Sequence, residues 1–218
     1  VLIIGLGGLG SPVAFYLASA GVGTLVLADD YVVDESNLQR QIIHGEADVG
    51  INKVASAKAS IAALNSGVLV ETLRQRLSGE MLVKEVLKAD VVVDCCDNLV
   101  TRLAVNKACL QHQTPMISGA AIRMEGQVIV VDPRAPSTPC YHCLMQFTGQ
   151  QEHSCSTTGV MAPIVGIIGA IQAMEAIKVI SNFGQPLVGK LLLLDAKTMQ
   201  WKTFSLPKDA ACPSCSKI

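Results

Sequence analysis

Short apolar runs alternate with segments of helical spacing along the first 118 residues. In one such segment Val54, Ile61 and Leu64 fall on one side of a helix. We predict strands over residues 1–4, 24–28, 68–73, 91–94 and 115–118, and helices over residues 11–20, 52–64, 80–88 and 101–112. Because such alternation builds parallel strands joined by crossover helices, the pattern predicts a doubly wound, mostly parallel α/β sheet.

The pattern changes after Gly126. We expect antiparallel C-terminal strands over residues 127–131, 190–194 and 200–205, with a long loop over residues 132–158 and an apolar helix over residues 161–180. A loop longer than about 15 residues in a compact domain is usually functional or mobile. We therefore expect residues 146–156 to be mobile when no partner is bound.

Composition narrows the class of protein. Apolar residues make up 50% of the 218 positions and charged residues 16%, which excludes a disordered chain. The net charge of −1 gives no basic field for a polyanion, so we expect no nucleic-acid partner. Mean hydropathy is +0.42, but the longest apolar run, residues 160–171, falls short of the ~20 residues of a membrane span. We expect a buried helix there and no membrane contact.

The N-terminus bears on targeting. No basic region precedes the first apolar run, so we expect no signal peptide and a cytoplasmic protein. The chain lacks an initiator Met and opens on a strand, so we expect that a segment precedes it in the full protein.

A glycine-rich segment follows the first strand and leads into a helix. It reads Gly5-Leu6-Gly7-Gly8-Leu9-Gly10-Ser11. Glycines let the backbone turn tightly and approach a phosphate, and a helix N-terminus adds free N–H groups and a positive dipole end. Asp29 lies 19 residues after Gly10, where a Rossmann fold places an acid on ribose hydroxyls. We predict a nucleotide site; the alternative is a glycine turn between packed elements.

Two cations favour a triphosphate over a dinucleotide. Arg40 lies in a polar block, and Lys53 follows 13 residues later at the start of the next helix. Arg supplies a planar fork and Lys a point charge, and both can neutralise phosphates. A nicotinamide ring needs neither. The alternative is a solvated surface pair.

A second acid follows the buried strand over residues 91–94. Asp97 and Asn98 come at the carboxyl edge, where open α/β sheets bind ligands. Magnesium favours one or two carboxylates together with phosphates and waters, so Asp97 is a candidate Mg²⁺ ligand. The two residues are also suited to cap the next helix, and both roles are compatible.

Four of the eight cysteines form two Cys-x-x-Cys pairs, Cys140 with Cys143 and Cys212 with Cys215. Four thiolates at this spacing are typical of a closed, structural zinc site. A redox dithiol is the alternative, and two matching pairs argue against it. His142, inside the first pair, is expected to be a neighbour of the metal.

The remaining cysteines have different surroundings. Cys155 lies in a polar stretch, where an exposed thiol can act as a nucleophile; an ordinary loop cysteine is the alternative. Cys109 falls on a predicted helix and is expected in the core. Cys95 and Cys96 follow a strand and are expected to line the pocket.

Taken together, these motifs resemble the bacterial sulfur-carrier protein adenylyltransferases of the ThiF and MoeB type, simple relatives of ubiquitin-activating enzymes. The resemblance covers nearly the whole chain. It rests on the glycine segment, Asp29, Lys53 and the blocks over residues 37–41, 94–98, 118–127, 158–163 and 172–178.

The resemblance implies adenylation of the C-terminal Gly-Gly of a small ubiquitin-like carrier by ATP and Mg²⁺, with release of pyrophosphate. A carboxylate is ionised at pH 7, so positioning and charge neutralisation suffice. It implies catalytic roles for Arg40, Lys53, Asp97 and Cys155. It also implies a nucleotide site made of Gly5, Gly7, Gly8, Gly10, Asp29, Ser36, Asn37, Leu38, Gln39, Arg40, Gln41, Lys53, Asp97 and Asn98.

Two branches of the family differ in their carrier, one in thiamine and the other in molybdopterin biosynthesis. Residues 26–30 with Gln200 and Trp201 look more like the thiamine branch, and residues 119–126 more like the molybdopterin branch. The cysteine matching Cys155 is linked covalently to the carrier only in the thiamine branch. Family members usually have an N-terminal helical segment that can supply an Arg to a partner subunit, and no such Arg can be assigned in this sequence, which opens on a strand. We expect a homodimer because the apolar helix and its glycines suit a buried contact.

We expect one domain over residues 1–218, with a nucleotide-binding part over 1–125 and a carrier-binding and zinc part over 126–218. Two other functions stay open. One is an NAD-dependent oxidoreductase, and the other is a zinc-stapled scaffold that binds the carrier without chemistry.

Overall fold

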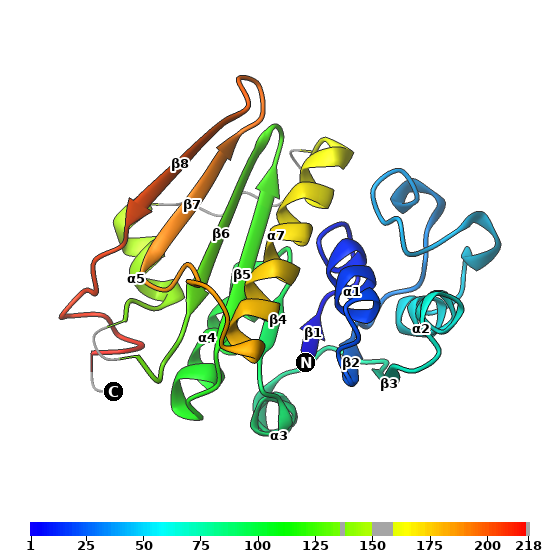
Figure 1. The fold of residues 1–218 in the computed structure, drawn as a ribbon, viewed down its shortest axis with the longest axis horizontal. Helices are drawn as coiled ribbons and strands as arrows, with labels where there is room; N and C mark the ends of the chain where they lie inside the picture. The colour runs from blue at the N-terminus through cyan, green and yellow to red at the C-terminus, as the bar shows by residue number, and fades with distance from the viewer. Residues whose placement is uncertain (136–137, 150–158, 217–218) are drawn as a thin grey trace.

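The protein forms one mixed α/β sheet with helices on both faces (Figure 1). The structure is a computed structural model, and it describes residues 1–135, 138–149 and 159–216. Within these residues eight strands pair in the order β3-β2-β1-β4-β5-β6-β7-β8. Strand β1 lies between β2 and β4, and the order of the strands reverses there. This reversal is the switch point at which doubly wound sheets bind ligands.

The N-terminal half confirms the predicted parallel pattern, since β3, β2, β1, β4 and β5 all pair in parallel. The strands are β1 (Leu2–Ile4), β2 (Thr24–Ala28), β3 (Leu69–Leu73), β4 (Val92–Asp94) and β5 (Met116–Ile122). Their helices are α1 (Gly10–Ser19), α2 (Lys53–Leu64), α3 (Gly79–Lys88) and α4 (Leu99–Gln111), with the short 3-10 turns η1 (Glu35–Asn37) and η2 (Glu46–Asp48) between β2 and α2.

The C-terminal half is antiparallel, as predicted. It contains β6 (Glu125–Val131), β7 (Lys190–Asp195) and β8 (Gln200–Ser205) with the helices α5 (Tyr141–Thr148) and α7 (Ala162–Ser181). The strand expected over 115–118 continues to Ile122, because β5 forms a hairpin with β6 in which Ile122 pairs with Glu125. Arg123 turns this hairpin with φ 51°.

The prediction of a continuous loop over residues 132–158 is wrong, because α5 forms within it. The helix begins directly after Cys140, and its first backbone N–H, that of Tyr141, donates to Asn106 Oδ1 at 2.9 Å. Residues 146–148, expected to be mobile, belong to this helix, and residues 150–156 lie outside the described part of the chain. The sequence did not predict this helix, because only one of its faces is apolar and buried and the apolar pattern is therefore weak.

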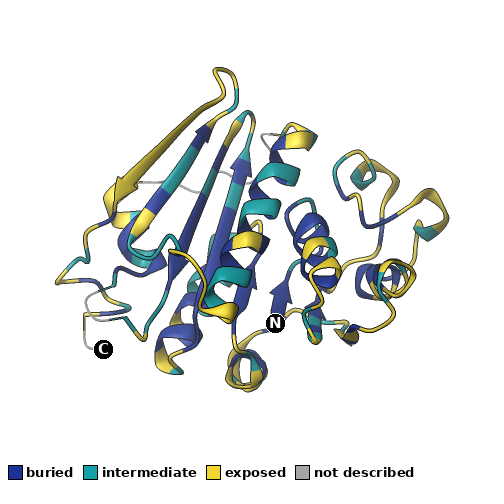
Figure 2. Ribbon diagram, viewed as in Figure 1, coloured by how far each residue is buried: buried dark blue, intermediate teal, exposed yellow. Residues whose placement is uncertain are grey.

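Two apolar clusters cover the two faces of the sheet (Figure 2). Leu17, Ile61 and Ile168 bring α1, α2 and α7 onto one face. On the other face, α3 packs through Val86, α5 through Leu144, and α4 through several further apolar residues. The sheet is therefore buried on both sides through most of its parallel half, as its continuous apolar strands require.

Of the described helices, α7 alone is long and apolar enough to cross a membrane by length and composition. Half of its apolar stretch is buried inside the protein, where the helix packs against α1, β5 and β6. The helix expected around residues 160–171 is therefore present, and it is half-buried rather than fully buried.

Close contact between α7 and α1 depends on Gly169. A Cβ at this position would lie 2.5 Å from the Leu9 carbonyl oxygen and 2.5 Å from Pro12 Cγ. A Cβ on Gly166, one turn earlier on α7, would meet no atom within 4 Å.

These two glycines predict opposite effects of the same substitution. We expect Gly169→Ala to lower the free energy of unfolding by about 1–3 kcal/mol, because the helices must move apart. Gly166→Ala should leave it unchanged or raise it by up to about 1 kcal/mol, because alanine favours a helix interior. Urea unfolding of both variants measures the difference, and equal stabilities would contradict this packing.

Candidate functional site

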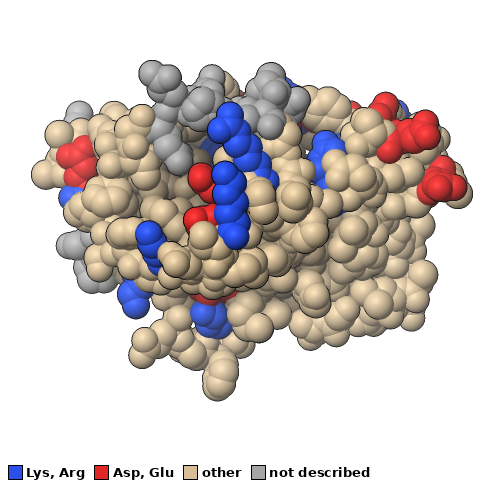
Figure 3. Space-filling view, turned by 90° about the horizontal axis from the view of Figure 1, so that it is seen from above, with Lys and Arg blue, Asp and Glu red and all other residues tan. Residues whose placement is uncertain are grey.

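A cavity of about 420 Å³ opens at the carboxyl edge of the parallel strands. Its lining comes from the segments that follow β1, β2, β3 and β4, with Val165 of α7 and Ala121 of β5 on the remaining side. Figure 3 looks onto the sheet from above, and basic and acidic side chains meet near the middle of this face. The cavity therefore lies at the switch point expected of a doubly wound sheet.

The glycine segment forms one wall, and its glycines are needed for different reasons. Gly5 has φ 91°, and a Cβ there would lie 2.8 Å from the Cys95 carbonyl oxygen. A Cβ on Gly8 would lie 2.8 Å from Val165 Cγ2, and one on Gly10 would overlap the carbonyl oxygen of Gly5. Gly5, Gly7 and Gly8 line the cavity, whereas Gly10 is buried behind it at the start of α1. The sequence analysis attributed these glycines to phosphate contact. At Gly5, Gly8 and Gly10 close packing alone already leaves no room for a side chain.

Asp29 is tied to the glycine segment. Its Oδ2 accepts a hydrogen bond from the backbone N–H of Leu6 at 2.7 Å, and its Oδ1 accepts from that of Tyr31 at 2.8 Å. The side chain is buried at the end of β2 and lines the cavity. Each oxygen keeps a further lone pair, so the carboxylate can still accept from a hydroxyl group.

His44 supports the same segment from below, and sequence reasoning missed it. Its Nε2 lies 3.1 Å from the Leu6 carbonyl oxygen, and its Nδ1 lies 2.7 Å from Ser56 Oγ. Nε2 donates to the carbonyl, so Nδ1 accepts from the serine hydroxyl in the neutral ring. Burial lowers the pKa of His44, which favours this neutral form.

Lys53 and Arg40 face the same cavity. Lys53 is only 7% exposed, so it is not part of a solvated surface pair. Burial lowers the pKa of the Lys53 ammonium group, whereas the nearby Asp29 and Asp97 carboxylates act in the opposite direction. Arg40 is held by a hydrogen bond from Nη1 to the Ser36 carbonyl oxygen at 3.1 Å. The pair thus places two positive charges beside the glycine segment.

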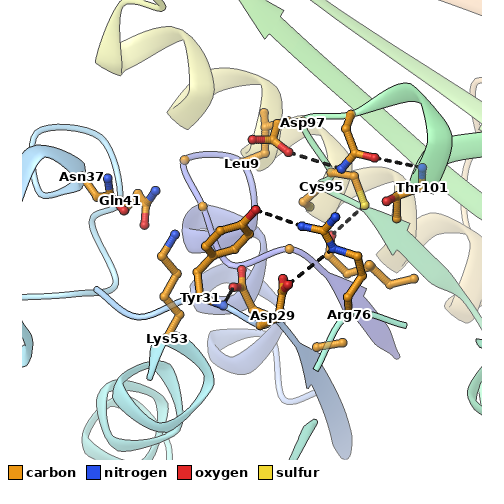
Figure 4. A pocket seen from close by; sticks show the side chains of 18 of the residues that line it. Leu9, Asp29, Tyr31, Asn37, Gln41, Lys53, Arg76, Cys95, Asp97 and Thr101 are labelled. Atoms are coloured by element: carbon orange, nitrogen blue, oxygen red, sulfur yellow. Dashed lines mark hydrogen bonds and ion pairs between the residues drawn. The ribbon is translucent and has the colours of Figure 1, made fainter. Parts of the chain in front are cut away.

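Asp97 and Asn98 take different positions after β4. Asn98 caps α4, because its Oδ1 accepts from the backbone N–H of Thr101 at 2.9 Å. Asp97 is exposed and lines the cavity, with Asn98 Nδ2 3.5 Å from its Oδ1 (Figure 4). Capping thus falls to Asn98, and the Asp97 carboxylate stays directed at the cavity.

The block over residues 36–41 divides between the cavity and the surface. Asn37, Arg40 and Gln41 line the cavity, whereas Ser36, Leu38 and Gln39 lie outside the lining. Gln41 is 4% exposed, and its Oε1 has no hydrogen-bond partner among the described residues. Cys155 lies outside the described part of the chain.

Among the lining residues that sequence reasoning missed are Tyr31, Arg76 and Arg102. Arg76 follows β3, and the rule that placed Asp97 after β4 applies equally to it. Arg102 is 6% exposed and forms an ion pair with Asp94 at 3.9 Å. Nothing in the sequence of α4 distinguishes that arginine from a surface residue.

Cys95 and Cys96 line the cavity, as expected, and Cys109 is buried in the core. Burial raises the pKa of the Cys95 and Cys96 thiols, with the Asp94 carboxylate acting in the same direction. These two groups therefore stay protonated at neutral pH and are poor nucleophiles.

The four paired cysteines meet at the N-terminal end of α5. The sulfur atoms of Cys140, Cys143, Cys212 and Cys215 all lie within 4.8 Å of one another, and all four residues are buried. Measured pairs are 4.0 Å for Cys140–Cys143, 3.7 Å for Cys140–Cys212 and 3.5 Å for Cys143–Cys215. His142 stands outside the cluster, with its Nδ1 2.9 Å from Ser214 Oγ. This four-cysteine cluster ties α5 to a C-terminal segment 72 positions away.

Comparison with solved structures agrees with this architecture. The chain matches the crystal structure of E. coli MccB with ATP at a TM-score of 0.84 and 23% identity, covering 99% of this chain and 66% of that one. At that identity the match shows the fold.

Comparison of sequences adds the family. The chain is 46% identical over 215 residues to the sulfur carrier protein ThiS adenylyltransferase of Escherichia coli, covering 99% of this chain and 85% of that protein. It is 43% identical over 217 residues to the molybdopterin-synthase adenylyltransferase of Salmonella typhimurium, covering 100% and 87%. The model of the ThiF family matches residues 1–214, and the chain therefore belongs to the ThiF family.

Proposed function

We propose that this protein uses ATP and Mg²⁺ to adenylate the C-terminal carboxylate of a small ubiquitin-like sulfur carrier ending in Gly-Gly, releasing pyrophosphate in thiamine or molybdopterin cofactor biosynthesis. The observation that carries the proposal is the cavity in which the glycine segment, Lys53, Arg40 and Asp97 meet. Relatives that match nearly the whole chain are named a sulfur carrier protein adenylyltransferase and a molybdopterin-synthase adenylyltransferase, which supports the proposal.

The chemistry needs no general base. A carrier carboxylate oxygen attacks the α-phosphorus of ATP, an acyl–phosphate bond forms, and the bond to the β-phosphate breaks with its electron pair leaving on pyrophosphate. Negative charge builds on the phosphate oxygens, so catalysis depends on positioning and on fixed positive charge. Lys53 and Arg40 supply that charge, and the glycine N–H groups complete the phosphate site.

Two other side chains complete the assignment. Asp29 is the ribose acceptor, since its oxygens stay available after bonding Leu6 and Tyr31. Asp97 would hold Mg²⁺, because its carboxylate lines the cavity and its charge acts on Lys53, whose pKa it raises. When bound, Mg²⁺ neutralises phosphate oxygens and helps pyrophosphate to leave.

The two alternative functions fit the cavity less well. The nicotinamide ring of a dinucleotide has no need of a buried lysine beside a second cation. A scaffold that only binds a carrier needs no carboxylate facing such cations. The Gly-Gly tail of a carrier, by contrast, ends in a carboxylate that Lys53 and Arg40 can help to neutralise together with the phosphates.

The four-cysteine cluster fits zinc. Four Zn–S bonds of about 2.3 Å in a tetrahedron place sulfur atoms about 3.8 Å apart, close to the separations measured for three pairs here. Burial raises the pKa of the Cys140 thiol to about 11, so a cation is needed to hold it as a thiolate. Cys140, Cys143, Cys212 and Cys215 would be the ligands of a structural ion, remote from the reaction.

We further propose a homodimer and a cytoplasmic location.

ATP–pyrophosphate exchange tests the function directly. We expect exchange that depends on a carrier ending in Gly-Gly, measured side by side with purified thiamine and molybdopterin carriers. Asp97→Asn should reduce exchange about a hundredfold or more, the scale of removing one preorganised electrostatic contact. Glu71 is an exposed acid on β3, so Glu71→Gln is the matched control and should leave the exchange rate unchanged. Full-length protein silent with both carriers would refute the proposal.

The lowered pKa of Lys53 predicts a pH dependence. Phosphate neutralisation needs the protonated amine, and burial brings its pKa below the ordinary 10.5. We therefore expect kcat/KM for ATP to fall as pH rises through the Lys53 pKa, at a lower pH than an exposed lysine would give. Lys53→Arg, charged throughout, should move this decline to higher pH, whereas Lys58→Arg on the exposed face of α2 should not. Identical profiles would exclude Lys53 as the titrating group.

Metal analysis tests the four-cysteine cluster. We expect one zinc per chain, lost in Cys212→Ser and kept in His142→Ala, because His142 bonds Ser214 and stands outside the cluster. Loss of the metal opens a cross-linked loop of 72 positions, which lowers the free energy of unfolding by about 4 kcal/mol. Each kcal/mol lowers Tm by about 2–4 °C at this chain length. Cys212→Ser should therefore lower Tm by roughly 10 °C. Metal loss from His142→Ala would show that the ligand set is incomplete.

A further inference from the structure

The ring of Tyr31 lies between two cations at the rim of the cavity. Lys53 Nζ is 5.4 Å from the ring centroid, and the guanidinium carbon of Arg76 is 5.9 Å from it. Arg76 Nη2 also donates to the phenol oxygen at 2.9 Å, and its Nε lies 3.4 Å from Asp30 Oδ2. Figure 4 shows the phenol group directed at the Arg76 guanidinium, with Lys53 on the other side of the ring.

The two cations lie on different sides of the Tyr31 ring (Figure 4). Lys53 lies toward the glycine segment and couples to Arg40 and Asp29. Arg76 follows β3, the strand beyond β2, and is adjacent to Leu77. Leu77 joins Ala28, Ile4 and Cys96 in one apolar cluster that also lines the cavity. These apolar residues form a surface next to Asp29, the proposed ribose acceptor, and such a surface suits the base of a nucleotide.

We infer that Arg76 is a further nucleotide-binding residue that covers the nucleoside end of ATP, and that Tyr31 is the positioning residue that holds it there. The inference rests on the proposed function, since it takes ATP to be the ligand. A planar guanidinium stacks on an aromatic base and so suits this end of the site. Lys53 neutralises the phosphates, and the Tyr31 ring separates the two cations.

The surroundings of Arg76 favour the nucleoside over the phosphates. Its side chain is 53% exposed, so without contacts it would sample many rotamers. The Tyr31 phenol and the Asp30 carboxylate fix the guanidinium in one place before ligand binds. Asp30 also compensates its charge, so Arg76 adds little to the field at the phosphates.

Binding of two probes separates the ends of the site. Calorimetry with full-length protein compares ATP with inorganic tripolyphosphate, which lacks the nucleoside. We expect Arg76→Ala to raise the Kd for ATP about tenfold and to leave the Kd for tripolyphosphate within about twofold. Tyr31→Phe, which keeps the ring and removes the hydroxyl, should raise the Kd for ATP about threefold. Arg74→Ala, an exposed arginine two positions earlier, is the matched control and should bind both probes as the wild type does.

Steady-state kinetics adds a second measurement. If Arg76 binds ATP equally in the ground and transition states, Arg76→Ala raises KM for ATP and leaves kcat unchanged. Arg76→Lys keeps the charge without the planar fork, and we expect it to recover less than half of the lost affinity. Thermal unfolding should be the same for all variants, because both side chains are exposed.

Each failure has a distinct meaning. Wild-type protein that does not bind ATP would overturn the proposed function and this inference together. ATP binding that is unchanged in Arg76→Ala would overturn the inference alone. Equal losses for ATP and tripolyphosphate would place Arg76 at the phosphates and refute its assignment to the nucleoside. Tyr31→Phe with wild-type affinity would remove the positioning role of Tyr31.

Discussion

A single buried guanidinium, that of Arg102, joins α4 to β5 and to α5 beside the cavity. Arg102 of α4 donates to the carbonyl oxygens of Cys96 and Gly119, so it links the segment that follows β4 to the middle of β5. It also pairs with Asp94, which is fully buried and accepts a hydrogen bond from Ser118 Oγ at 2.6 Å. Removing one partner of such a pair leaves an uncompensated buried charge and costs about 3–5 kcal/mol. The carboxyl edge that carries the cavity is therefore fixed by this arginine.

The same arginine connects the cavity to the four-cysteine cluster. Its Nη1 lies 3.3 Å from the hydroxyl of Tyr141, and its guanidinium carbon is 5.7 Å from the Tyr141 ring centroid. Tyr141 follows Cys140 directly, and its backbone N–H bonds Asn106 one turn further along α4. The cluster thus holds the first turn of α5 against α4, and α4 presents Arg102 to the sheet edge. A remote structural metal can in this way support the geometry of the site without touching it.

Sequence patterns predicted the strands, the order of the motifs and the four paired cysteines, because each depends on spacing along the chain. They missed α5, since a short helix held by its cysteines and by Asn106 has little periodicity of its own. They also missed Arg102 and His44, whose importance comes from contacts across 16 to 39 positions of sequence. For Gly8 the motif was found and its reason was incomplete, because Val165 of α7 fills the space that a Cβ would need. Local chemistry can be read from one sequence, whereas packing partners from distant elements cannot.

Charge balance in the cavity explains why a metal ion belongs to the proposed reaction. Among the described lining residues, Arg40, Lys53 and Arg76 are matched by Asp29, Asp30 and Asp97, and Arg102 is matched by Asp94 behind the wall. The protein's own charges there are therefore close to balanced, and ATP would bring several negative charges into the cavity. Lys53, whose pKa burial lowers, cannot offset them alone. In the proposed reaction a divalent cation held by Asp97 would supply the missing charge at the phosphates, and Asp97 would then act on ATP through that ion.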